Sequence, residues 1–160
     1  MRYRSLILAC LGLLAAAPAF AQQPSGAATP SMDSVRAALR ADKRQLVAAN
    51  MVLTTAENAA FWPVYDAYQA DLAKLSTPTV AVIKSYATAY NAKAVTDAVA
   101  SQLTNEVIAI DRDRVNLMQS YLSKFSAVLP GAKVARYYQI ENKLRAAVNY
   151  ELADAIPLVQ

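Results

Sequence analysis

The sequence predicts an all-α fold, a hairpin or bundle of four to five helices with one long helix and one proline-kinked helix. Apolar residues recur at helical spacing over most of the chain, and no long stretch alternates with the period of two that strands require. Turn residues typical of β-hairpins are missing, and the 160 residues include only 3 glycines. These observations favour helices joined by short connections.

The N-terminal residues have the pattern of a secretory signal peptide. Arg2 and Arg4 form a basic start, residues 6–17 are apolar, and Ala19-Phe20-Ala21 is a small-residue cleavage site. An uncleaved membrane anchor is the alternative. The apolar stretch is shorter than the ~20 residues that a spanning helix needs, which favours cleavage.

We therefore expect cleavage after Ala21 and a periplasmic location, without stable membrane insertion afterwards. Residues 1–21 are the signal peptide, residues 22–30 a flexible polar lead-in, and residues 31–160 a single all-α domain. Cleavage would leave 139 residues (160 minus 21), enough for one domain with its own core.

Composition excludes several classes of function. Cleavage removes two of the 16 basic residues and none of the 12 acidic ones, which leaves 14 minus 12, or +2. This charge does not suit a dedicated nucleic-acid binder. Cleavage also removes the only cysteine, Cys10, and the chain has no histidine. The usual zinc, copper and haem ligands are then absent, as are imidazole and thiolate catalysts. We expect no enzyme, no cofactor, no metal site and no catalytic residue.

The first helix is expected to begin at Thr29 or Ser31 and to end near Ala49. Four basic residues lie on one side of it: Arg36, Arg40, Lys43 and Arg44. A solvated face is one interpretation of such a charge run. The other is an electrostatic contact with an acidic protein segment or an anionic lipid.

The second helix is expected to begin after Thr54 and to end near Leu75. Thr54 followed three residues later by Glu57 predicts a capping box, in which side chains satisfy free N–H groups at the helix start. Aromatic and leucine residues then follow at spacings of 4, 3, 4 and 3, which indicates a buried seam. They are Phe61, Tyr65, Tyr68, Leu72 and Leu75.

Trp62 and Pro63 interrupt the regularity of this helix. Trp62 lies about 100° from Phe61, at the boundary between core and solvent. Pro63 lacks the N–H that would bond to Ala59, which predicts a kink. A kinked aromatic helix can form one wall of a binding surface, and plain packing at the boundary is the alternative.

Three further helices are expected over residues 79–92, 97–128 and 132–155. Ser76-Thr77-Pro78 ends or bends the preceding helix, and Thr96 caps the longest one. The apolar stripe of the longest helix includes Val107 and is broken by Arg114, and that of the last helix includes Val148.

Two charged residues interrupt apolar stripes on different helices. Arg114 lies in the stripe of the longest helix, and Glu141 lies on the face of Tyr137 and Leu144. We expect a structural ion pair between Arg114 and Glu141, since a charge on an apolar face needs a partner.

A weak internal echo occurs at an offset of 76 residues. Leu53-Thr54 corresponds to Leu129-Pro130, and Phe61-Trp62 corresponds to Tyr137-Tyr138. Two helical hairpins of similar design would produce this pattern, and chance similarity between alanine-rich helices is the alternative.

With these features, the chain resembles the periplasmic LTXXQ-motif proteins, the Spy/CpxP-like group. The motif stands here as Leu53-Thr54-Thr55-Ala56-Glu57, with Glu in place of Gln, and the second copy keeps only Leu129. The resemblance implies a homodimeric, cradle-like helical hairpin that binds unfolded or stress-damaged envelope proteins or damps a stress sensor.

We therefore expect a chaperone-like protein or envelope-stress adaptor whose partners are unfolded or envelope proteins. The expected binding surface comprises Trp62, Pro63 and the basic residues of the first helix. A structural module for one specific envelope partner is the alternative.

Overall fold

A computed structural model describes residues 32–159, and for residues 32–40 it describes the helical backbone alone. This part of the chain forms five helices and no strand, which confirms the all-α prediction. The helices are α1 (Met32–Asn50), α2 (Thr55–Lys74), α3 (Ser76–Asn91), α4 (Asp97–Val128) and α5 (Gly131–Ala155). The expected signal peptide, lead-in and cap of the first helix lie outside the described residues. The chain divides into residues 1–37 and 38–160, and the described side-chain contacts all belong to the second unit.

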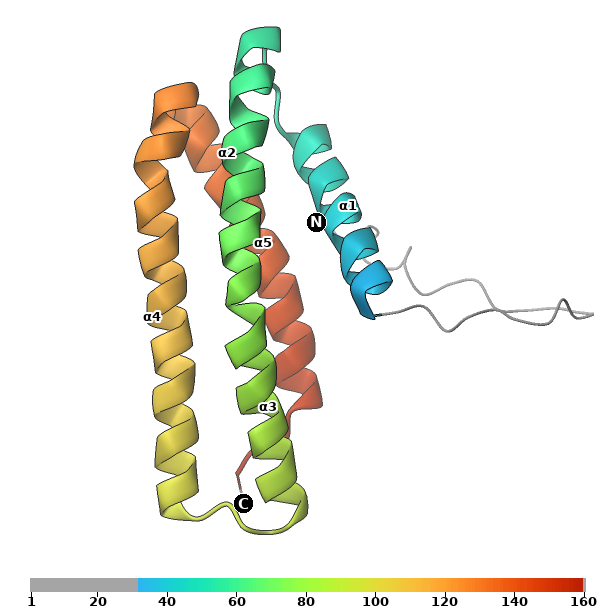
Figure 1. The fold of residues 1–160 in the computed structure, drawn as a ribbon, viewed down its shortest axis with the longest axis vertical. Coiled ribbons are helices and arrows are strands. Elements are labelled where there is room, and N and C mark those ends of the chain that lie inside the picture. The colour runs from blue at the N-terminus through green and yellow to red at the C-terminus, as the bar shows by residue number, and fades with distance from the viewer. Residues whose placement is uncertain (1–31, 160) are drawn as a thin grey trace, which may run out of the picture. The chain divides into compact units, whose positions relative to one another are not determined.

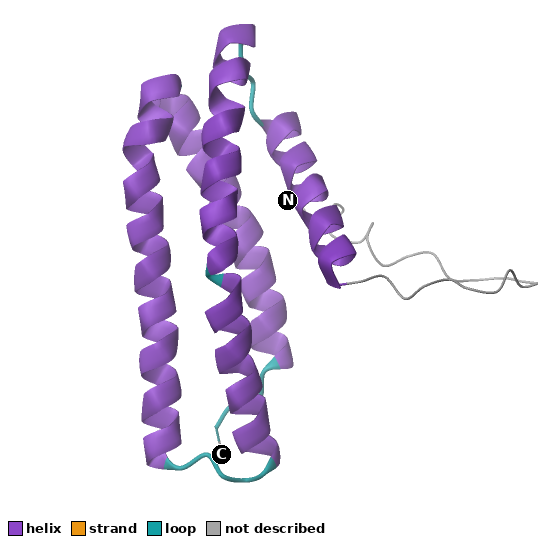
Figure 2. Ribbon diagram, viewed as in Figure 1, coloured by secondary structure: helices purple, strands orange, loops and turns teal. Residues whose placement is uncertain are grey.

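Helices α2 and α3 form one arm that runs alongside α4. Leu75 alone separates α2 from α3, and it keeps right-handed helical angles (φ −74°, ψ −15°). Figure 1 shows the two helices end to end beside α4, and Figure 2 shows the interruption between them. Pro78 is the third residue of α3, where a missing N–H breaks no intrahelical bond. The helix therefore begins three residues earlier than the sequence suggested.

The helix containing Pro63 is continuous. Helix α2 runs through Pro63 from Thr55 to Lys74, with the proline exposed on its surface. Figure 2 shows no loop or turn within α2. The break in this arm therefore falls at Leu75 and not at the proline.

The connection from α3 to α4 turns on a left-handed residue. Lys93 has a φ of 53°, a conformation that usually requires glycine. The N–H of Lys93 donates to the carbonyl of Tyr90 and that of Ala94 to the carbonyl of Ala89. This pair of bonds is a Schellman motif, which satisfies the last carbonyls of α3.

The core is a cluster of aromatic rings at one end of the arm. In the predicted seam, Leu72 and Leu75 are only partly buried, whereas Phe61, Tyr65 and Tyr68 of α2 are buried as predicted. They meet Phe125 of α4 and Tyr137 of α5, whose ring centroids lie 4.6 Å apart. Edge-to-face and tilted ring pairs of this kind add to the stabilisation from apolar burial.

Some apolar residues that the sequence placed in stripes are exposed. Val107 of α4 has 47% of its surface exposed, and Val148 of α5 has 59%. In α1, Leu46 is 47% exposed, whereas the neighbouring Val47 is fully buried. A helix that packs against few neighbours buries a narrow stripe, so apolar residues beside that stripe stay on the surface.

The internal echo corresponds to residues that meet in space. Lys133 donates to the Glu57 carboxylate over 2.5 Å, and the rings of Phe61 and Tyr137 have centroids 5.3 Å apart. Each of these pairs is separated by 76 residues along the chain. The first two turns of α2 and α5 therefore contact each other at positions that correspond in the echo.

The predicted capping box at the start of α2 is confirmed. The Thr54 hydroxyl accepts from the Glu57 N–H over 3.3 Å, and the Glu57 carboxylate accepts from the Thr54 N–H over 2.7 Å. The hydrogen bond from Lys133, followed by that from Thr54, lowers the pKa of Glu57 below its ordinary value of 4.5.

We expect this carboxylate to contribute to acid sensitivity. Its folded-state pKa is depressed, so its stabilising contribution is present above pH 4.5 and is lost as the pH falls through the lower folded value. Glu57→Gln should therefore lose less stability than the wild type between pH 7 and pH 3 in urea unfolding. Lys74 likewise lowers the pKa of Asp71. Asp71 therefore makes both proteins less stable at low pH, so some acid sensitivity remains in Glu57→Gln. If the wild type and Glu57→Gln lost the same free energy of unfolding between pH 7 and pH 3, the assigned role of Glu57 would be wrong.

Candidate functional site

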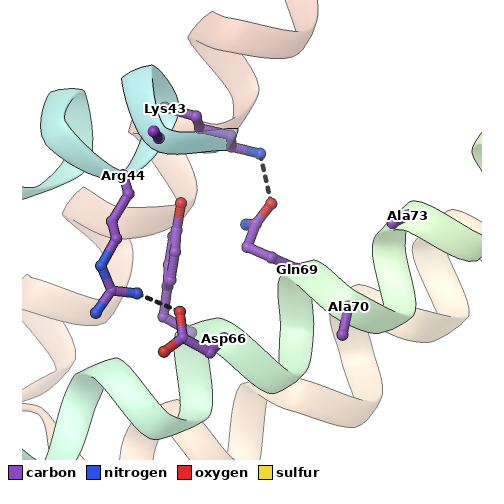
Figure 3. Close-up of a pocket in the computed structure, with 8 residues that line it drawn as sticks. Lys43, Arg44, Asp66, Gln69, Ala70 and Ala73 are labelled. Carbon is purple, nitrogen blue, oxygen red and sulfur yellow. Dashed lines mark hydrogen bonds and ion pairs between the residues drawn. The ribbon is translucent and has the colours of Figure 1, made fainter. Parts of the chain in front are cut away.

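The residues that the sequence singled out for binding meet between α1 and α2. Lys43 and Arg44 of α1 face Asp66 and Gln69 of α2 across a hollow of about 430 Å³. Figure 3 shows Arg44 directed at Asp66 and Lys43 directed at Gln69, with Ala70 and Ala73 further along α2. The side chains of Arg36 and Arg40 lie outside the described residues.

Trp62 is half-buried and packs against the edge of the core. Its ring lies edge-on to those of Phe61 and Tyr65, with centroids 5.0 Å and 5.1 Å away, and its Nε1 donates to Asn58 over 2.7 Å. The guanidinium carbon of Arg44 lies 4.1 Å from the ring centroid of Trp62. Arg44 also pairs with Asp66. Asp66 therefore holds the guanidinium group over one face of the indole ring.

Lys43 belongs to a network that joins α1, α2 and α5. Its Nζ donates to Glu141 over 2.8 Å and to Gln69 over 2.9 Å. The Gln69 amide in turn donates to the other Glu141 oxygen over 3.0 Å and to the Tyr137 hydroxyl over 3.2 Å. Glu141 is 7% exposed and is the only buried charged side chain in the described part of the chain.

The charged network lies against the aromatic core. Burial, reinforced by the negative charge of Glu141, raises the pKa of Tyr65 to about 12 and also raises the pKa of Tyr137. Both phenols therefore keep their protons at neutral pH. The network joins α1, α2 and α5 and can fix their relative orientation.

The predicted ion pair between Arg114 and Glu141 is wrong. Glu141 is paired with Lys43, and Arg114 forms no ion pair with any described residue. A buried carboxylate on α5 did require a cation, but three helices could supply one. Lys43 is the partner because α1 lies where its side chain reaches both Gln69 of α2 and Glu141 of α5.

Since Trp62 is the only tryptophan, its fluorescence reports directly on the Arg44 contact. We expect Arg44→Ala to shift the emission to longer wavelength and to increase quenching by acrylamide, because the indole face becomes hydrated. Arg112→Ala, which removes an exposed arginine from α4, is the matched control and should leave both properties unchanged. An unaltered spectrum in Arg44→Ala would show that the arginine does not cover the ring.

Sequence reasoning missed an apolar row on α4. Ile108, Val115 and Leu122 are 58%, 57% and 48% exposed and are spaced by seven residues. Seven residues make almost two full helical turns, so the three side chains share one face. The spacing was visible in the sequence, but nothing there indicated which of the apolar rows of α4 is buried. We refer to these three residues as the α4 row.

No family model matches this chain, and no curated protein or solved structure matches it. Within residues 32–159, no helix is long and apolar enough to cross a membrane. The described side chains also include no group of three or more His, Cys, Asp or Glu that could hold a metal ion.

Proposed function

We propose that this protein is a non-enzymatic periplasmic protein that binds unfolded or partner proteins of the cell envelope, in the manner of a chaperone or stress adaptor. The N-terminal pattern of basic, apolar and small residues supports export. The Leu53–Glu57 motif, with its capping box, supports membership of the LTXXQ-motif group.

The α4 row carries the proposal. Its three side chains span 14 residues, a length of about 21 Å on a helix. Scattered apolar residues are normal on a protein surface, whereas an aligned row indicates a contact surface. Asp111 and Arg112, both exposed, lie between Ile108 and Val115 along the helix. Charges of both signs beside an apolar row suit partners of varied sequence.

The α4 row replaces the Trp62 surface in this proposal. Arg44 lies over the Trp62 ring, and Lys43 is bound to Glu141, so both residues are engaged in contacts with other parts of the molecule. We assign these residues to holding α1 on the core.

A module for one specific envelope partner is the second candidate. Apolar residues at seven-residue spacing can form one side of a coiled-coil seam, which would favour a single helical partner. The two candidates differ in selectivity: a chaperone suppresses the aggregation of unrelated unfolded proteins, whereas a dedicated module does not.

The test is suppression of aggregation of a chemically unfolded model protein at near-stoichiometric amounts, followed by light scattering. We expect the wild type to suppress aggregation and the triple variant Ile108→Gln, Val115→Gln and Leu122→Gln to lose most of this activity. Glutamine is a good helix former, so α4 should keep its stability.

The matched control carries the same three glutamines on another side of α4, at Asn105, Asn116 and Ser123, all exposed. It should retain wild-type activity. No suppression by the wild type would exclude the chaperone proposal and favour the dedicated module. Equal loss in both triple variants would show that the α4 row is not the contact surface.

A further inference from the structure

A second hollow, distinct from the α4 row, lies between α1, the α2–α3 arm, α4 and α5. Its volume is about 530 Å³, within the range of about 300–1,000 Å³ typical of small-molecule sites. Most of its wall is aliphatic. The large aliphatic lining residues are Leu46, Leu72, Met118, Leu144, Val148 and Leu152. We call this hollow the α5 groove.

A tyrosine hydroxyl at the wall of the α5 groove has no hydrogen-bond partner among the described residues. Tyr68 lines the groove and is 2% exposed, yet its hydroxyl forms no hydrogen bond with any described residue. No buried polar atom lacks a partner in the described part of the chain, so this hydroxyl reaches the open space of the groove. Burial and the charge of Glu141 raise the pKa of Tyr68, so the hydroxyl keeps a proton to donate.

Two arginines that pair with no described carboxylate line the same groove. Arg114 forms no ion pair with a described residue, and Arg145 donates only to the side-chain oxygen of Asn142. Both positive charges act on Tyr68, where they oppose the rise in its pKa. The two arginines and Tyr68 therefore line the same hollow, close enough for the positive charges to act on the hydroxyl.

The remaining charges of the α5 groove leave this region positive. Glu141 is neutralised by Lys43, which also lines the groove, and Asp42 is the one further acidic residue there. With Lys43, Arg114 and Arg145 against Glu141 and Asp42, the lining carries three positive and two negative charges, a net +1.

We propose that the α5 groove binds a fatty carboxylate, a single-chain amphiphile with an anionic head. The head accepts hydrogen bonds from Tyr68, Arg114 and Arg145, and the acyl chain lies along the aliphatic wall. Arginine is suited to such a head because its N–H groups match the two carboxylate oxygens.

An acyl chain fits this lining better than an extended peptide does. The walls are helices, whose backbone N–H and C=O groups are already bonded to one another. An extended peptide would leave its own amides without partners in such a groove, whereas an acyl chain has no hydrogen-bonding groups to satisfy.

The test is calorimetric titration of the full protein with tetradecanoate and dodecanoate below their micellar concentrations. We expect one site, with binding weakened roughly tenfold when the chain loses two methylene groups. Arg114→Gln and Tyr68→Phe should each weaken binding about tenfold, since each removes one hydrogen bond to a charged group. Arg112→Gln removes an arginine outside the groove and should leave the affinity unchanged.

Dodecyltrimethylammonium, with the same tail and a positive head, provides the ligand control and should not bind. Equal affinity for the cation, or equal affinity of the Arg114→Gln and wild-type proteins for tetradecanoate, would overturn the proposal. Thermal unfolding of each variant shows whether it is folded. If the folded wild type bound neither fatty acid but did bind an acidic amphipathic helical peptide, the groove would be a site for a protein segment. That result would also overturn the fatty-carboxylate proposal.

Discussion

Replacing Phe61 with alanine is expected to destabilise the fold by about 3–5 kcal/mol, the usual cost of removing a buried aromatic ring. Phe61 is fully buried and contacts four other rings, those of Trp62, Tyr65, Phe125 and Tyr137. These rings come from α2, α4 and α5, so the cavity left by the substitution cannot close by movement of one side chain.

Urea unfolding followed by circular dichroism measures this effect. Tyr150→Ala is the matched control, because Tyr150 is also an aromatic residue of a helix but is 74% exposed. It should change the stability by less than about 0.5 kcal/mol. Similar losses in the two variants would mean that the aromatic cluster is not the core.

Lys43→Met should destabilise the protein by roughly 2–3 kcal/mol. The substitution keeps the aliphatic stem and removes the cation that neutralises Glu141. Breaking a buried ion pair costs about 3–5 kcal/mol, and we expect less here because the Lys43 side chain remains 25% exposed. Gln69 still donates to Glu141, which limits the loss further.

A double-mutant cycle isolates this interaction. Glu141→Gln removes the buried charge, so Lys43→Met should cost much less in that background than in the wild type. Lys74→Met is the control, since Lys74 is 76% exposed in its pair with Asp71 and should contribute little. Additive effects of the substitutions at Lys43 and Glu141 would show that the two side chains do not interact.

Local sequence signals predicted the helices well. The capping box at Thr54 and Glu57 and the cap at Thr96 fall where the structure has helix ends. The last helix, expected from residue 132, begins one residue earlier at Gly131. Each depends on residues within a few positions of one another, which a sequence displays directly. The start of α3 was predicted too late, at residue 79, because Pro78 was interpreted as a helix break. A proline is compatible with the first turn of a helix, and α3 begins at Ser76.

Contacts between distant helices were harder to predict. Helical spacing identified Phe61, Tyr65 and Tyr68 as buried, but it could not show that Val107 and Val148 are exposed. Burial at those positions depends on how many neighbours each helix has. The partner of Glu141 depended in the same way on the position of α1.

The candidate site changed for the same reason. Trp62 and Arg44 were both recognised as unusual, but as parts of one binding surface and not as partners of each other. The α4 row and the unpaired Tyr68 hydroxyl became visible only when the buried faces were known.

Site-specific photo-crosslinking tests the proposed contact surface most directly. A benzophenone amino acid placed at Val115, in the α4 row, should crosslink to an unfolded model protein on irradiation. The same amino acid at the adjacent exposed Asn116 should crosslink more weakly, because that position lies about 100° around the helix from Val115. Strong crosslinking at Asn116, or crosslinking at Trp62 with none at Val115, would contradict the assignment of protein binding to the α4 row.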